Sequence, residues 1–224
     1  MSRAFDTMQD SIQDREQKVI YQARHDVLTT LYNRNHAEVL LTERFNSKVT
    51  FQAIGINIYG FRGVNDTFGY HNGDLCLYEL AQRVIALGGL SARLTGGELL
   101  WVPDKILSAE ELIIVKEKLD GDVMADDLSI PMTLAIGVIN CPPDTHSPSE
   151  LFRRMNIVID EAQITRHFIL NFSQELEEKY TRRLSIITEL KKELFNTQGE
   201  LALFYQPKFN LVDKEVTAVE ALIR

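Results

Sequence analysis

The sequence predicts an α/β layer fold with one long helix before it and another after it. Stretches of helical periodicity alternate with short apolar, β-prone runs, which is typical of a sheet covered by helices. Hydrophobic residues make up 45% of the 224 residues and charged residues 25%, the balance of an ordinary globular protein. The net charge of −8 offers no basic face, so we expect no nucleic-acid partner.

Residues 1–25 form the first expected segment, a polar helix with a narrow apolar seam. The seam consists of Phe5, Met8, Ile12, Val19 and Ala23. Such a seam is too thin for a globular core and suits a helix that pairs with its twin in a homodimer. A helix packed on its own domain is an equally good interpretation of the same pattern.

The first half of the central region reads as helix, strand, loop, helix and hairpin. A new helix is expected from Asp26 to about Asn46, and the apolar run from Val49 to Ile58 predicts a buried strand. Residues 65–73 have a loop-like composition, and 74–87 have helical periodicity. Residues 90–102 predict a hairpin that turns at Thr95-Gly96-Gly97, where glycine tolerates positive φ.

The second half continues the alternation. We expect a helix over 109–119, a strand over 130–139 and a helix over 148–167 that is capped by Ser147 with Pro148 at its first position. A second amphipathic helix then runs to about Gly199. Its seam is Leu176, Tyr180, Leu184, Ile187, Leu190 and Leu194. Two short strands follow, over 201–209 and 216–222, with Asp213-Lys214 at the bend.

The two cysteines, Cys76 and Cys141, indicate buried, reduced thiols, because no C-x-x-C or Cys/His cluster accompanies them. The sequence shows neither a signal peptide nor an apolar run of bilayer length. We therefore expect this part of the protein to be cytoplasmic.

Several motifs in order carry a family resemblance. Asp26-x-Leu-Thr-x-Leu-Tyr-Asn-Arg34, the stretch from Asn57 to Asp74 and Arg93-Leu-Thr-Gly-Gly-Glu-Leu99 resemble the motifs of GGDEF domains, which join two GTP molecules into cyclic-di-GMP. Thr133 to Gly137 is similar to the strand that follows the signature. The resemblance implies a ferredoxin-like core, with antiparallel pairs in its central sheet, over residues 26–170.

The two ends carry further resemblances. Residues 1–24 are similar to a HAMP exit helix, a signalling helix, which implies a longer protein that is anchored in the inner membrane upstream. After a linker helix over 171–198, residues 199–224 resemble the first two strands of an EAL phosphodiesterase domain, in Leu203-Phe-Tyr-Gln-Pro207 and Val219-Glu-Ala-Leu-Ile-Arg224.

The resemblance implies a metal site from which the carboxylates have been lost. The family's first metal-binding Asp corresponds to Asn57. A gapless alignment of the signature reads Thr95, Gly96, Gly97, Glu98 and Leu99, which puts Gly97 at the second metal position. Sliding the two glycines onto the family's own would put Glu98 there, but it inserts a residue after Arg93. We favour the gapless alignment and a plain hairpin turn.

The remaining site positions are mixed. Gln163 stands where the family has a phosphate-binding lysine, and His167 stands in place of an arginine. Ala86 and Gly89 replace the product-inhibition motif. Asn65 and Asp74 match the guanine-binding positions, although both types of residue also cap turns and helices. The backbone N–H groups of Tyr59, Gly60 and Phe61 could hold a phosphate.

We therefore expect a regulatory module that can bind GTP, lacks cyclase catalysis, needs no metal cofactor and acts on a downstream EAL phosphodiesterase. In a complete EAL domain, Glu220 would bind Mg²⁺ or Mn²⁺ and Gln206 would lie near the substrate; here both are expected to be idle. An active diguanylate cyclase and a pure protein-interaction module without nucleotide are the alternatives.

Overall fold

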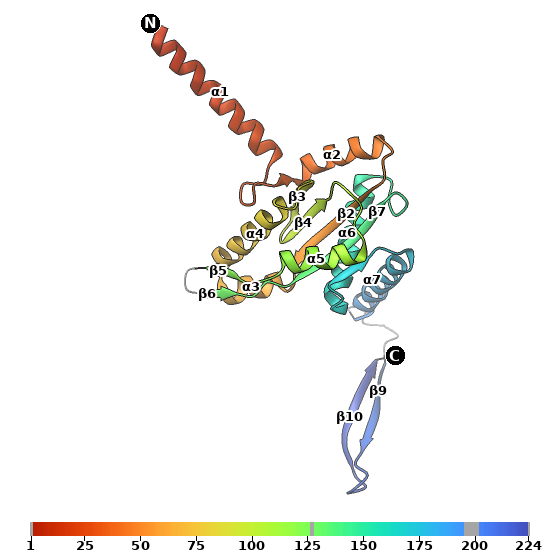
Figure 1. Cartoon of the computed structure of the whole chain (residues 1–224). Helices are drawn as coiled ribbons and strands as arrows, with labels where there is room; N and C mark the ends of the chain where they lie inside the picture. The colour runs from red at the N-terminus through yellow and green to blue at the C-terminus, as the bar shows by residue number, and fades with distance from the viewer. Residues whose placement is uncertain (1, 126–127, 195–201, 224) are drawn as a thin grey trace. The chain divides into compact units, whose positions relative to one another are not determined.

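The computed structural model describes the backbone of residues 2–125, 128–194 and 202–223, and side chains for 12–125, 128–194 and 202–222. The chain divides into two units, Met1–Glu177 and Glu178–Arg224. The first unit contains a six-stranded mixed sheet with helices on both faces (Figure 1). The predicted mixed α/β class is confirmed. Within the described ranges, no helix has the length and apolar character needed to cross a bilayer.

The elements of the first unit follow one another in a regular alternation. They are α1 (Ser2–Arg24), β1 (Tyr32–Asn33), α2 (Arg34–Asn46), β2 (Phe51–Ile58), α3 (Phe61–Phe68), α4 (Tyr70–Ile85), β3 (Leu90–Thr95), β4 (Glu98–Val102), α5 (Ala109–Leu119), β5 (Val123–Ala125), β6 (Leu128–Ile130), β7 (Leu134–Cys141), α6 (Pro148–Thr165) and β8 (Ile169–Asn171). In Figure 1, α1 extends away from the sheet.

The sheet has the order β1-β3-β4-β2-β7-β8, with parallel pairs only at its two edges. Its central strand β2 is buried on both faces, which is why its sequence is a continuous apolar run. Ile54, Ile56 and Ile58 face a core with α4 and α5, whereas Phe51 and Ala53 face α2 and α6. The two cores hold the helices in fixed positions over the sheet.

Helix α6 lies close to the sheet because two glycines face each other beneath it. Gly55 pairs with Gly137 across β2 and β7. A Cβ atom at Gly55 would stand 2.3 Å from Sδ of Met155, and one at Gly137 would stand 2.9 Å from Cγ1 of Val158. Any larger residue would push α6 away from the strands.

The structure corrects the predicted loop over residues 65–73. This stretch is helical, and Gly69, with φ of +85°, separates α3 from α4. Its Asn, Asp and Gly residues favour turns. Packing stabilises a helix here instead, because Phe61, Val64 and Phe68 lie against the main core. Helix α4 consequently begins at Tyr70, earlier than expected.

Other observed boundaries also differ from the predicted ones. Residues 26–33 form a turn and β1 before α2 begins, and the strand predicted over 130–139 is split between β6 and β7. Helix α6 ends at Thr165, because Arg166 adopts a left-handed conformation with φ of +56°. The hairpin, the helix over 109–119 and the Ser147 cap with Pro148 at the first position are confirmed. Cys76 and Cys141 are both buried and free, as predicted.

Helix α7 (Gln174–Leu194) continues into the second unit, which also contains β9 (Leu203–Phe209) and β10 (Val216–Ile223). The strands form an antiparallel hairpin, as predicted, although Gly199 and Leu201 lie outside the described residues. Glu220 pairs directly with Gln206, and its carboxylate lies 3.3 Å from Nζ of Lys208. The side chains of β9 are exposed along its whole length.

Candidate functional site

The signature hairpin places Glu98 opposite Asn57. Strand β4 begins at Glu98, which pairs with Asn57 at the end of β2. The register of β3 against β4 shifts between Arg93 and Thr95, so the hairpin holds an extra residue before its turn. This bulge accommodates the insertion that the shifted alignment requires. Glu98, one residue beyond the position that the gapless alignment assigns, is therefore directly across from Asn57.

Both of these residues carry a buried oxygen without a hydrogen-bond partner. The atoms are Oδ1 of Asn57 and Oε2 of Glu98. Burial raises the pKa of Glu98; the nearby Asp160 carboxylate raises it further, and the Arg34 guanidinium opposes them. A buried unpartnered oxygen is costly unless a cation or a donor approaches it.

Gly97 leaves no room for a side chain of its own. A Cβ atom there would lie 2.9 Å from the Phe61 ring and 3.1 Å from Oδ1 of Asn57. The neighbouring Gly96 adopts φ of +53°, which suits the turn. Within the signature, Glu98 is thus the residue that brings a carboxylate to the end of β2.

The two predicted guanine-binding residues lie on adjacent helices. Asn65 of α3 packs against α4, since a Cβ atom at Gly73 would stand 1.8 Å from Oδ1 of Asn65. Asp74 follows Gly73 and is exposed. The N-cap of α4 is Gly69, so Asp74 lies inside the helix and does not cap it. The residue next to Asp74, Gly73, thus lies against the Asn65 amide, while the role of the two residues in binding guanine stays a prediction.

The predicted phosphate cradle needs a correction at Tyr59. Its backbone N–H donates to the carbonyl oxygen of Thr133 at 2.8 Å, so it is not available to a ligand. Gly60 is the N-cap of α3, with φ of +66°, and Phe61 is the first residue of that helix. N–H groups of a first helical turn have no partner within the helix. The cradle is therefore reduced to Gly60 and Phe61.

The family can now be stated from the comparison with protein-family models. The model described as "Diguanylate cyclase, GGDEF domain" matches residues 23–167. The chain belongs to the GGDEF family. The match covers the signature hairpin, α6 and every strand of the six-stranded sheet except β8.

Curated relatives of this GGDEF chain are much longer. The cyclic di-GMP phosphodiesterase NbdA of Pseudomonas aeruginosa is 28% identical over 213 residues, which cover 90% of this chain and 27% of NbdA. The bifunctional diguanylate cyclase/cyclic di-GMP phosphodiesterase MucR of the same species is 26% identical over 221 residues, 92% of this chain and 32% of MucR. The chain thus spans less than a third of each relative's length.

Solved GGDEF structures share the fold. The GGDEF domain of TpbB (YfiN) from Pseudomonas aeruginosa matches with a TM-score of 0.63 at 20% identity, covering 70% of this chain and 99% of that one. The coiled coil and GGDEF domain of DgcB from Caulobacter crescentus, in complex with c-di-GMP, matches at 0.61 and 18% identity, covering 76% and 98%.

At the two positions where the family resemblance implies a phosphate-binding lysine and an arginine, this GGDEF domain has Gln163 and His167. Gln163 is half-buried on α6, whereas His167 lies beyond the helix end and is exposed. The sequence reading missed two charged residues. Arg34, the first residue of α2, stacks over the Phe152 ring at 4.9 Å, and Asp160 lies on α6 near Glu98. The Asp26–Arg34 motif contains Arg34, but only the packing of α2 and α6 brings either residue to the site.

The donor set of this GGDEF domain does not fit a pair of divalent cations. Hard cations prefer carboxylate and carbonyl oxygens, and a pair needs several of them. Here the unpartnered oxygens belong to one carboxylate and one amide. Over the described part of the chain, no three His, Cys, Asp or Glu side chains are grouped to hold a metal ion.

Proposed function

We propose that this chain is the regulatory GGDEF domain of a cyclic-di-GMP signalling protein and does not cyclise GTP. The observation that carries the proposal is the Asn57–Glu98 pair, which offers one carboxylate where the family resemblance implies two. Phosphoryl transfer depends on neutralising the charge of the phosphates. Gln163 and His167 stand in place of the family's lysine and arginine, and the amide of Gln163 carries no charge.

The test is GTP turnover to cyclic-di-GMP at high protein concentration with Mg²⁺ or Mn²⁺. We expect no product from the natural sequence. Asn57→Asp restores the second carboxylate. Alone or together with Gln163→Lys, it should raise the rate of cyclic-di-GMP formation above that of the natural sequence. Product formation by the unaltered chain that disappears in Glu98→Gln would refute the proposal.

An active cyclase is the second candidate, and one observation favours it. Glu98, not Gly97, is opposite Asn57, so the signature keeps a carboxylate at the end of β2. Its unpartnered Oε2 could accept a single cation. The same turnover assay separates this candidate from the regulatory one.

We also propose that the domain binds a guanine nucleotide through Asn65 and Asp74. A carboxylate accepts from the N1–H and N2–H₂ groups of guanine, and an amide adds a donor or an acceptor. Calorimetry with GTP, GDP and ATP should show a weak preference for guanine with little dependence on Mg²⁺. Asp74→Ala should lose binding and Asp66→Ala, an exposed acid on α3, should keep it; if both bind GTP equally well, the domain is better described as a protein-interaction module.

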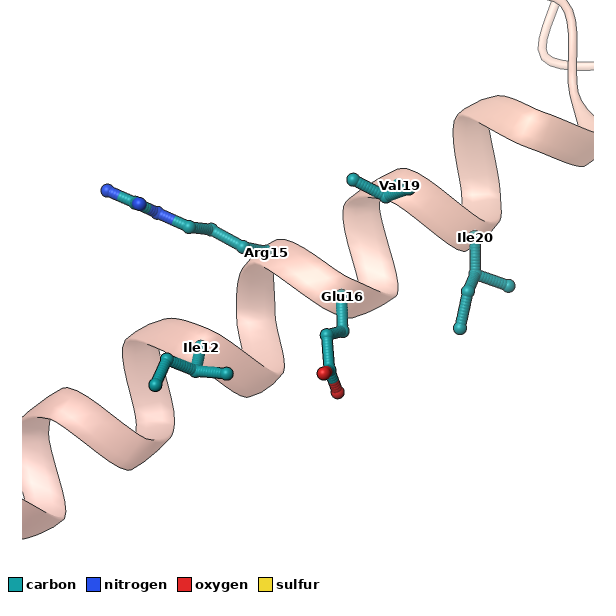
Figure 2. Close-up of a pocket in the computed structure, with 5 residues that line it drawn as sticks. All are labelled: Ile12, Arg15, Glu16, Val19 and Ile20. Carbon is teal, nitrogen blue, oxygen red and sulfur yellow. The ribbon is translucent and has the colours of Figure 1, made fainter.

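The homodimer that we propose would form through α1. The described side chains from Ile12 to Ile20 are all exposed, so the domain does not cover this part of α1. Ile12, Val19 and Ile20 are 48%, 64% and 52% exposed. Together with Arg15 and Glu16 they line a pocket on the surface of α1 (Figure 2). Sedimentation of the natural chain and of Val19→Glu checks this, since a charge in the seam should shift the equilibrium to monomer.

We propose that the domain acts on a downstream EAL phosphodiesterase. In the longer protein, a membrane anchor would precede α1. The hairpin of β9 and β10 pairs Glu220 with Gln206, the two residues that match EAL positions. NbdA and MucR, which carry phosphodiesterase in their names, support this reading. A chain extended through a complete EAL domain should hydrolyse cyclic-di-GMP with Mg²⁺ or Mn²⁺, and Glu220→Ala should abolish that activity.

A further inference from the structure

The last turn of α1 is joined to the domain by a ladder of aromatic rings. Tyr21 stacks on His25 with ring centroids 4.1 Å apart, and His25 lies 4.8 Å from Tyr32 in β1. The side chain of Asn33 also donates to the carbonyl oxygen of Ala23 at 2.9 Å. The end of α1 and strand β1 are therefore held together from both sides.

The residue after the ladder's histidine continues the connection. Asp26 Oδ1 accepts hydrogen bonds from the backbone N–H of Thr29 at 2.9 Å and from its hydroxyl at 2.7 Å. The same oxygen accepts from Nη1 of Arg93 in β3 at 3.1 Å. Burial alone would raise the pKa of Asp26, but the hydrogen bonds from Thr29 and Arg93 outweigh it and hold the pKa below its ordinary value.

Arg93 then reaches the signature turn. Its Nε and Nη2 donate to the carbonyl oxygen of Gly96 at 3.2 and 2.9 Å, while its Nη1 binds Asp26. One planar guanidinium thus connects Asp26, the second residue after α1, to the turn that precedes Glu98. The side chains of Arg93 and Asp26 are only 20% and 25% exposed, so solvent screens this bridge less than a surface ion pair.

We propose that Arg93 is a positioning residue that transmits the orientation of α1 to the signature turn. The route runs from Tyr21 through His25 and Asp26 to Arg93 and ends at Gly96, two residues before Glu98. A lysine could not replace it, because an ammonium group lacks the fork that binds both partners at once. The inference rests on the proposed regulatory role of α1, but it requires neither nucleotide nor turnover.

The test is amide hydrogen exchange at Gly96, Gly97 and Glu98 in the full chain. Arg93→Lys and Asp26→Asn should each speed exchange at these amides about fivefold, the size expected when a charge-assisted hydrogen bond is lost. His25→Ala, which removes the central ring of the ladder far from the turn, should speed it in the same direction. The double variant His25→Ala/Asp26→Asn should exchange no faster than Asp26→Asn alone, because both changes cut one route.

Lys105→Met is the matched control. It breaks the ion pair between Lys105 and Glu111, with Nζ and Oε1 2.5 Å apart, which lies off the route, and it should leave exchange at the turn unchanged. Circular dichroism and Trp101 fluorescence verify that each variant is folded; if Asp26→Asn unfolds, Arg93→Lys serves in the double variant. The proposal is overturned if His25→Ala leaves the turn as it is, or if the effects of the two substitutions multiply. If the natural chain binds no GTP in calorimetry, the proposed nucleotide binding is contradicted, but the hydrogen-exchange test of this route is unaffected.

Discussion

Replacing Glu98 by glutamine should raise the free energy of unfolding at neutral pH. Burial and the Asp160 carboxylate raise the pKa of Glu98, so the folded chain holds that proton more tightly than the unfolded chain does. Ionised Glu98 therefore lowers the free energy of unfolding, and this penalty is absent below the unfolded pKa of about 4.3. It develops as the pH rises through the folded pKa. Glutamine has the same shape and no charge, so it removes this penalty.

The expected gain is about 1 kcal/mol. A buried polar oxygen without a partner costs about 1–3 kcal/mol, and Oε2 of Glu98 is such an atom. The lower end of that range applies for two reasons: the side chain is only partly buried, and the Arg34 guanidinium opposes the shift in pKa. The amide of glutamine also keeps some of the polar cost.

Urea unfolding followed through Trp101, the only tryptophan, measures this difference in the unit that contains the site. The gain of Glu98→Gln over the natural chain should appear at pH 7–8 and vanish near pH 4. Glu79→Gln, at an exposed glutamate on α4, should change little at either pH. A stability loss in Glu98→Gln at pH 7 would refute the argument. Stabilisation of the natural chain by millimolar Mg²⁺ that is lost in Glu98→Gln would favour the cyclase candidate.

Three further outcomes are expected from urea unfolding. Asp26→Asn should lose about 1 kcal/mol at pH 7, because hydrogen bonds to its carboxylate lower the pKa of Asp26; the difference should fade as the pH drops below about 3.9. Gly97→Ala should lose about 1–3 kcal/mol, since its Cβ atom would stand 2.9 Å from the Phe61 ring. Gly55→Ala should lose a similar amount through its contact with Met155, and Met155→Ala in the same chain should offset part of the effect of the added methyl group.

Local chemistry made much of the fold predictable. Ser108 with Glu111 forms a capping box at the start of α5, and Ser147 with Pro148 starts α6, so both helices began where they were expected. The loop predicted over 65–73 was wrong because packing against the core outweighs the preference of its Asn, Asp and Gly residues for turns. Strands β1 and β8 are too short to leave a periodic pattern, and their parallel pairing depends on distant parts of the chain.

The candidate site was predictable only in part, for a related reason. Alignment found Asn57 and the signature, but residue spacing cannot show that a bulge after Arg93 shifts Glu98 into register with Asn57. It also could not show that the N–H of Tyr59 is already bonded to the carbonyl oxygen of Thr133, just before β7. Asp160 comes to Glu98 from a separate helix, and this proximity is a property of the packed structure.

The packing beneath α6 argues for a domain that keeps its architecture for reasons other than turnover. Gly55 and Gly137 still let the helix lie against the sheet, an approach that any larger residue would prevent. Gln163 on the same helix and His167 just beyond its end do not offer the fixed positive charges of the family pattern. A closely packed scaffold that lacks these two charges fits the structural or relaying role that we propose. The regulatory role that we propose, in which the domain holds α1 and the signature turn, needs this scaffold and not a metal pair.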